Sequence, residues 1–251
     1  MTSTVLVTGG TGTLGRHVVP MLRESDLKVR VLSRSSRQPE EGIEYFVGNL
    51  ATGEGIDAAV AGVDTIVHLA GDAKGDDDKA RTLVKAASEA GSPHIVYISV
   101  VGAEHDSFAY FAFKRGAEQV IADSGLPWTT VRATQFHDLV LTLAQALGKL
   151  PVVPVPAGFR VQPIDTRDVA ARLVELAQGE PSGLVPDIAG PKIYDLKDLV
   201  RSYLKATNRR RLLVPLFLPG KAAKSFRAGI NLAPTQAVGR HTWEDFLAAR
   251  G

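Results

Sequence analysis

Four closely spaced glycines near the N-terminus are the residues whose type and spacing point most directly to chemistry. They follow a short apolar run and precede a stretch with helical spacing of leucine and valine, and they can be counted as Gly10-x-Gly12-x-x-Gly15 or as Gly9-x-x-Gly12-x-x-Gly15. An early glycine permits a tight turn, Gly12 lets a pyrophosphate approach the backbone, and Gly15 lets a helix pack closely on a sheet. The free N–H groups at the helix start attract the anion. We therefore predict a dinucleotide-binding turn, with a ligand-free glycine turn as the alternative.

The end of the second predicted strand indicates which dinucleotide is bound. Dinucleotide folds that prefer NAD usually carry Asp or Glu there, whereas those that prefer NADP offer arginine to the 2′-phosphate. This chain has Ser33 and Arg34 at that point, with Arg37 close behind. A guanidinium can hold a phosphate with two hydrogen bonds, and a carboxylate would repel it. The sequence predicts NADP(H) as the cofactor; the alternative is that Arg34 is an ordinary surface arginine.

Several motifs together resemble the short-chain dehydrogenase/reductase superfamily. Residues 8–15 (TGGTGTLG) resemble its TGxxGxxG opening, residues 48–50 (GNL) its GDL segment with Asn49 in place of Asp, and residues 69–71 (LAG) its loop over the adenine ribose. Residues 162–170 and 189–191 resemble segments of the atypical, NmrA-like branch. The resemblance implies that the following residues bind the cofactor: Gly9, Gly10, Thr11, Gly12, Thr13, Leu14, Gly15, Ser33, Arg34, Arg37, Asn49, Leu50, Leu69, Ala70, Gly71 and Lys114.

The same resemblance implies a catalytic set. Tyr110 and Lys114 fit the superfamily's YxxxK motif, and Ser99 ends the fifth predicted strand. The spacing of four puts tyrosine and lysine on one helix face, where the ammonium would lower the tyrosine pKa from its ordinary value near ~10. The resemblance implies that Lys114 also bonds the nicotinamide ribose, that Ser99 holds the substrate oxygen and that Tyr110 passes the proton. The alternative places Tyr110 in an aromatic packing group with its phenylalanine neighbours.

A predicted substrate wall follows the sixth strand. Gln135, Phe136 and His137 lie where the superfamily places the wall of the nicotinamide pocket. For His137 a buried structural role is the alternative. The apolar residues that follow favour an uncharged aromatic or alicyclic acceptor over a sugar nucleotide.

Strands alternate with helices through the first half of the chain. Short apolar runs at residues 5–7, 28–32, 43–47, 64–69, 94–98 and 128–131 are separated by helical patterns, which indicates a parallel sheet with right-handed crossovers. We predict an α/β fold with a doubly wound parallel Rossmann sheet and a small C-terminal substrate lobe. Residues 1–135 form the predicted cofactor-binding core and 136–251 mostly the lobe, with 157–178 returning to the core sheet. Residues 150–156 are too proline-rich for a central strand.

Composition limits the remaining possibilities. The chain of 251 residues is 45% hydrophobic, has no cysteine and carries a net charge of +2. The absence of cysteine excludes disulfides and zinc–thiolate sites. The histidines show no metal spacing, so we predict no metal.

No uncharged apolar stretch is long enough to span a membrane. We predict a cytoplasmic protein with a small-molecule substrate and neither a nucleic-acid nor a membrane partner, with the oligomeric state left open. The clusters Asp76–Asp78 and Arg209–Arg211 are expected to be solvated.

The predicted function is that of an NADPH-dependent oxidoreductase reducing a small carbonyl, quinone or similar acceptor. Two alternatives share the fold. The first is an NADP(H)-sensing regulatory protein without turnover. The second is a nucleotide-sugar epimerase or dehydratase, which would hold a nucleotide diphosphate in its C-terminal lobe.

Overall fold

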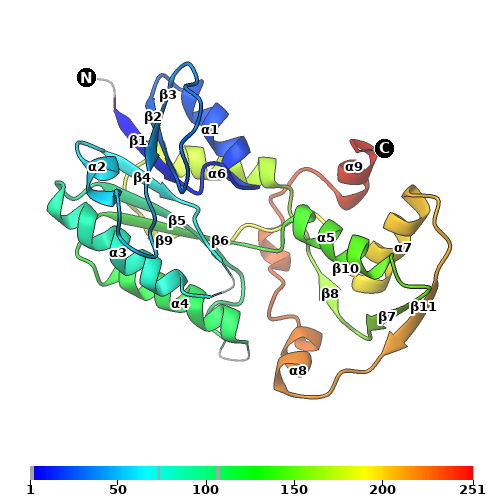
Figure 1. Cartoon of the computed structure of the whole chain (residues 1–251). Helices are drawn as coiled ribbons and strands as arrows, with labels where there is room; N and C mark the ends of the chain where they lie inside the picture. The colour runs from blue at the N-terminus through cyan, green and yellow to red at the C-terminus, as the bar shows by residue number, and fades with distance from the viewer. Residues whose placement is uncertain (1–2, 73, 106–107, 251) are drawn as a thin grey trace. The chain divides into compact units, whose positions relative to one another are not determined.

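The chain folds into two compact units. The computed structural model describes residues 3–72, 74–105 and 108–250 (Figure 1). The first unit comprises Met1–Ser99, Ala109–Arg132 and Ala170–Val185, and the second comprises Val100–Phe108, Ala133–Val169 and Pro186–Gly251. The chain therefore passes between the units several times. The assignment of residues 136–251 to substrate binding remains a prediction.

A seven-stranded sheet forms the centre of the first unit. Its order is β3-β2-β1-β4-β5-β6-β9, from β1 (Thr4–Thr8), β2 (Lys28–Ser33), β3 (Ile43–Val47), β4 (Thr65–His68), β5 (His94–Val100), β6 (Trp128–Ala133) and β9 (Gly183–Leu184). The pairs of β1 with β2 and β4, of β2 with β3, of β4 with β5 and of β6 with β9 are parallel. This arrangement confirms the predicted Rossmann sheet. The two-residue β9 was not predicted, because so short a strand has no periodicity to detect.

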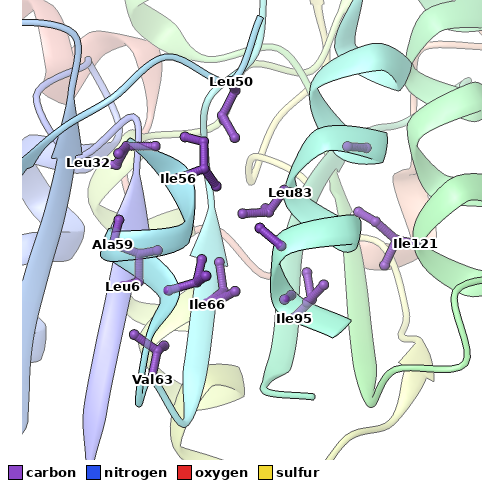
Figure 2. Packing of buried hydrophobic residues seen from close by; sticks show 14 of the residues in the cluster. Leu6, Leu32, Leu50, Ile56, Ala59, Val63, Ile66, Leu83, Ile95 and Ile121 are labelled. Atoms are coloured by element: carbon purple, nitrogen blue, oxygen red, sulfur yellow. The ribbon is translucent and has the colours of Figure 1, made fainter. Parts of the chain in front are cut away.

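Helices cover both faces of this sheet (Figure 1). They are α1 (Gly15–Arg23), α2 (Ile56–Val60), α3 (Asp76–Glu89), α4 (Ala109–Ala122) and α6 (Thr166–Gln178). Figure 2 shows how Leu6 and Ile66 of the sheet pack with Ala59 of α2, Leu83 of α3 and Ile121 of α4. Because side chains alternate along a strand, the buried neighbours of Leu6 on β1 point to the opposite face, where α1 lies.

The second unit has its own core. It contains α5 (His137–Leu147), β7 (Val152–Pro156), β8 (Arg160–Val161), β10 (Tyr194–Asp195), α7 (Leu196–Ala206), β11 (Leu212–Leu216), α8 (Lys221–Ala228), the 3₁₀ helix Pro234–Gln236 and α9 (Trp243–Ala248). Tyr203, Trp243 and Phe246 are among its buried residues. The proline-rich β7 pairs in parallel with β11 in a separate two-stranded sheet, so it is not a central strand. In the described part of the chain, no helix combines the length and the apolar character needed to cross a membrane.

Candidate functional site

The glycine turn connects β1 to α1, and its glycines have distinct structural roles. Gly9 has a φ of +69°, and a Cβ there would lie 2.8 Å from the backbone nitrogen of Ala70. Gly15 lies against Gly10, where a Cβ on Gly15 would come within 2.4 Å of backbone atoms. Gly12 is exposed, and α1 has no side-chain N-cap. The turn therefore presents an open, uncapped helix start, as a pyrophosphate site requires. The positive φ of Gly9 favours counting the motif from Gly9.

The predicted adenosine-side residues differ in exposure. Ser33 is buried, and its Oγ accepts the N–H of Ser35 at 3.4 Å, whereas Arg34 and Arg37 are exposed. The charge of Arg34 contributes to lowering the pKa of Asp72. Asn49 uses its Oδ1 to accept the N–H of Ala51 at 3.0 Å. Leu50 is buried in the core of the first unit, so its side chain packs and does not face a ligand.

Lys114 is buried beside the carboxylate of Asp76, which was predicted to be solvated. The Lys114 Nζ lies 2.9 Å from Asp76 Oδ2, and the two side chains are 9% and 1% exposed. The prediction that Asp76 is solvated is therefore wrong. The other carboxylate oxygen, Oδ1, accepts the N–H of Asp72 at 2.8 Å and lies 3.6 Å from Lys79 Nζ. A buried charge persists only when it is paired and hydrogen-bonded, and Asp76 meets both conditions.

Two glycines make room for this ion pair. A Cβ on Gly116 of α4 would lie 3.0 Å from Asp77 Cβ, so the absence of a side chain lets α4 approach the start of α3. A Cβ on Gly71 would lie 2.9 Å from Lys114 Nζ and 3.0 Å from Asp76 Oδ2. The loop that the sequence assigned to the adenine ribose therefore also covers the ion pair.

A chain of buried polar side chains connects Lys114 to the glycine turn. Lys114 Nζ lies 3.5 Å from Tyr97 Oη, and the Tyr97 ring stacks on His68 with ring centroids 5.4 Å apart. His68 Nδ1 lies 2.7 Å from Thr8 Oγ1, which also accepts the N–H of Ala70 at 3.3 Å. Since Thr8 already accepts one hydrogen bond, its hydroxyl can donate to His68 Nδ1. Burial, and then the Lys114 charge, lower the pKa of His68 to about 3, so His68 is neutral.

Tyr110 lies in the first turn of α4 and is half-buried. Its ring centroid lies 6.0 Å from Lys114 Nζ and 6.0 Å from the Phe111 ring centroid. Burial, and then the charge of Asp76, raise the pKa of Tyr110 to about 12. The prediction of a lowered pKa is wrong for this arrangement, because burial and the charge of Asp76 both raise the pKa of Tyr110. Tyr110 therefore holds its proton throughout the neutral range.

Ser99 lies near the end of β5 and is 1% exposed. Its Oγ makes no hydrogen bond with the described residues. A buried hydroxyl without a partner is uncommon in folded proteins and calls for an explanation. That Ser99 holds the substrate oxygen remains a prediction.

The three predicted substrate residues lie in the second unit and differ in environment. Gln135 donates from Nε2 to the backbone oxygen of Asn231 at 3.0 Å, and Phe136 is partly buried. His137 is fully buried, with ring centroids 4.9 Å from Phe246 and 5.9 Å from Trp243. This environment favours the structural alternative for His137.

The sequence matches a known protein family and several characterised relatives. Residues 9–180 match the model of a family described as NAD(P)H-binding. The chain belongs to this NAD(P)H-binding family. It is 29% identical to an NAD(P)H azoreductase of Xenophilus azovorans over 93% of the chain and 83% of that protein. It is 33% identical to a (4-alkanoyl-5-oxo-2,5-dihydrofuran-3-yl)methyl phosphate reductase of Streptomyces griseus over 75% and 68%. The prediction of an NAD(P)H-dependent oxidoreductase is confirmed at this level.

Solved structures show the same NAD(P)H-binding fold. An NADPH-dependent quinone oxidoreductase of Escherichia coli, determined with NADPH, superposes with a TM-score of 0.84 at 18% identity, covering 98% of this chain and 99% of that one. A nucleoside-diphosphate-sugar epimerase of Staphylococcus aureus gives 0.81 at 19% identity, covering 97% and 99%. At these sequence identities the structural similarity shows a shared fold and nothing more.

Sequence reasoning missed Asp76, Tyr97 and His68 in the site of this NAD(P)H-binding protein. One signal was available for His68, because Thr8 and His68 are paired residues on adjacent strands that end at the same sheet edge. Asp76 offered no such signal, since an acid in the first turn of a helix is ordinarily exposed.

Proposed function

We propose that this NAD(P)H-dependent oxidoreductase prefers NADPH and reduces a small uncharged acceptor, such as a carbonyl compound or a quinone. We also infer that it belongs to the NmrA-like branch of the short-chain dehydrogenase/reductase superfamily. The matched motifs between Thr8 and Gly71, together with Tyr110 and Lys114, support that assignment. Bound NADPH would supply the hydride.

The observation that carries the proposal is the fixed position of Lys114. An ammonium has three N–H donors. The Lys114 Nζ lies 2.9 Å from Asp76 Oδ2 and donates to Tyr97 Oη at 3.5 Å, which leaves donor capacity for a ribose hydroxyl. Because both partners belong to the same unit as the glycine turn, Lys114 is held in place before the cofactor binds.

Tyr110 is proposed as the proton donor. A phenol with a pKa of about 12 is protonated at neutral pH, which suits donation to an oxygen that gains negative charge as hydride arrives. At neutral pH the hydroxyl is therefore in the form that can donate a proton. Ser99, with its unpartnered hydroxyl, is proposed to hold the acceptor oxygen.

The choice of acceptor follows the curated relatives. The two relatives named above are both reductases, which supports a reducible small molecule as substrate. We retain Gln135 and Phe136 as proposed substrate residues and assign His137 a structural role. An epimerase or dehydratase would instead turn over a nucleotide sugar without net consumption of NADPH.

The test is NADPH oxidation against a panel of ketones, aldehydes and quinones. Tyr110→Phe removes only the hydroxyl and should lower turnover of carbonyl acceptors by roughly 10²–10⁴, the usual scale for a general acid, with unchanged NADPH affinity. Lys114→Ala should weaken NADPH binding as well. Tyr203→Phe, which removes a buried tyrosine hydroxyl in the second unit, is the matched control.

Two results would contradict the proposal. Tight NADPH binding without turnover of any acceptor would favour the sensing alternative. Full carbonyl reduction by Tyr110→Phe would remove this tyrosine from the chemistry. Quinones are the less decisive acceptors, because hydride transfer to them needs little acid catalysis.

A further inference from the structure

The charge of this chain is strongly segregated along its length. Residues 199–242 hold nine of the 29 Lys and Arg residues and none of the 27 Asp and Glu residues. The rest of the chain, with 20 basic and 27 acidic residues, has a formal net charge of −7. The overall value of +2 therefore conceals a basic segment in the second unit.

Five basic side chains of this region and the neighbouring Lys197 surround one hollow. The hollow, of about 580 Å³, lies between α7 and the start of β11 and is lined by Lys197, Arg201, Lys205, Arg209, Arg210 and Arg211. We call these six residues the basic cluster. Arg201 contacts Asp198, the one acidic residue on α7. The three consecutive arginines are exposed and lead directly into β11.

The sheet that follows the basic cluster exposes a wholly apolar face. Figure 1 shows β7 and β11 side by side. Their inner face carries Val153 and Val155, which are buried in the core of the second unit. Their outer face, which we call the apolar face, consists of Val152, Pro154, Pro156, Leu212, Val214 and Leu216. The valines and leucines in this set are 40–64% exposed.

The apolar face continues into the next loop. Phe217 is 70% exposed, and the guanidinium of Arg227 lies 4.7 Å from its ring centroid. Arg227 also donates to the backbone oxygen of Leu218 at 2.9 Å, which fixes the loop. Lys221 and Lys224 follow on α8 and are exposed. Exposed apolar side chains thus lie between basic residues on both sides in the sequence.

We propose that the apolar face and the basic cluster form a docking surface for an anionic lipid bilayer. Contiguous exposed apolar residues mark interaction sites, and apolar side chains flanked by Lys and Arg are the composition that binds at the lipid interface. A second copy of the chain fits less well, because the interface would bring two positively charged segments together. Strand addition to β11 is also disfavoured, because Pro215 removes one of its N–H donors. The prediction of no membrane partner went with the absence of a membrane-spanning stretch, which binding at a bilayer surface does not need.

The test is co-flotation of the full chain with vesicles, without substrate, so that its outcome is independent of the reductase chemistry. We expect binding to vesicles of phosphatidylcholine and phosphatidylglycerol, none to phosphatidylcholine alone, and a decline at high salt. The triple variant Arg209→Gln, Arg210→Gln, Arg211→Gln should weaken binding on the order of 10²-fold. Its control, Lys28→Gln, Arg81→Gln, Lys85→Gln, removes three exposed charges from the first unit and should bind normally.

The apolar contribution is tested separately. Phe217→Ser should also weaken vesicle binding, whereas Val238→Ser, at another exposed apolar position of the second unit, should not. Absence of binding to anionic vesicles by the folded wild type would overturn the proposal. So would unchanged binding by both the triple arginine variant and Phe217→Ser. A dimer in sedimentation that Leu212→Ser dissociates would assign the face to a second copy, and binding of DNA or pyrophosphate in place of vesicles would assign the basic cluster to a soluble anion.

Discussion

The ammonium of Lys114 lies 2.9 Å from Asp76 Oδ2, in a pair of side chains that are both almost fully buried. This pair joins the start of α3 to the middle of α4 and lies beneath Gly71. Removal of one partner from a buried ion pair leaves an uncompensated charge, which is more damaging than loss of the whole pair. The pair therefore both stabilises the first unit and holds the proposed cofactor ligand in place.

Replacement of Asp76 should affect both stability and the titration of Tyr110. Asp76→Asn leaves Lys114 without its counter-charge, so the free energy of unfolding should fall by about 3 kcal/mol. The pKa of Tyr110 should also fall from about 12, because Asp76 contributes to raising it. Denaturant unfolding and the ultraviolet titration of tyrosine measure the two effects. Asp78→Asn, at an exposed acid on the same helix turn, should change neither. Unaltered stability in Asp76→Asn would contradict the role of the pair.

Substitutions at two glycines of the turn should have different effects, one on cofactor binding and the other on folding. Gly12→Val should abolish NADPH binding while the fold survives, because Gly12 is exposed and a Cβ there has one close neighbour, Gly9 O at 3.2 Å. Gly15→Ala should destabilise the fold by at least about 2–3 kcal/mol, because its Cβ meets Gly10 backbone at 2.4 Å. Circular dichroism, thermal unfolding and calorimetry with NADPH separate these outcomes. Gly179→Val, with ordinary contacts, is the control. Normal NADPH binding by a folded Gly12→Val variant would show that the pyrophosphate binds elsewhere.

The preference for NADPH should depend on Arg34. This exposed arginine follows a strand end that carries Ser33 and no carboxylate. Arg34→Ala should weaken NADPH binding by about 1.5–3 kcal/mol, the scale of a hydrogen bond to a charged group, and leave NADH affinity nearly unchanged. Calorimetric titration with each cofactor measures the difference, with Arg81→Ala, an exposed arginine on α3, as the control. Equal affinities of the wild type for NADPH and NADH would refute the preference.

His68 should make the fold sensitive to acid. Its pKa is about 3 in the folded protein against an ordinary value near ~6.5 when unfolded, so between these values the unfolded state binds the extra proton. Stability should therefore fall as the pH drops below ~6.5, by about 2 kcal/mol at pH ~5 from this residue alone. His68→Asn keeps an acceptor for the Thr8 hydroxyl and should flatten this part of the pH dependence. His105→Gln, at an exposed histidine, should not. An equally steep curve for His68→Asn would assign the acid sensitivity to other groups.

Local patterns were sufficient for the sheet and the glycine turn. The turn depends on missing side chains at fixed spacing between a strand and a helix, and that information lies within residues 4–23. The parallel arrangement of the strands follows from their alternation with helices and the handedness of the crossovers. The proposed NADPH preference likewise rests on adjacent residues, Ser33 and Arg34.

Contacts between distant segments required the tertiary structure. Asp76 reads as a solvated first-turn acid, and it is buried because Gly116 lets α4 approach closely enough for Lys114 to meet it. The pKa of Tyr110 rises, contrary to the prediction from its spacing to Lys114, because burial and the charge of Asp76 both raise it. Residues 212–216 form a strand that was not predicted, and a short apolar run has the same appearance in the sequence whether another element covers it or not. The sequence alone determined the backbone architecture and the cofactor turn, whereas only the tertiary structure decided which charges are paired and which apolar side chains face solvent, because pairing and burial depend on neighbours that are distant in the chain.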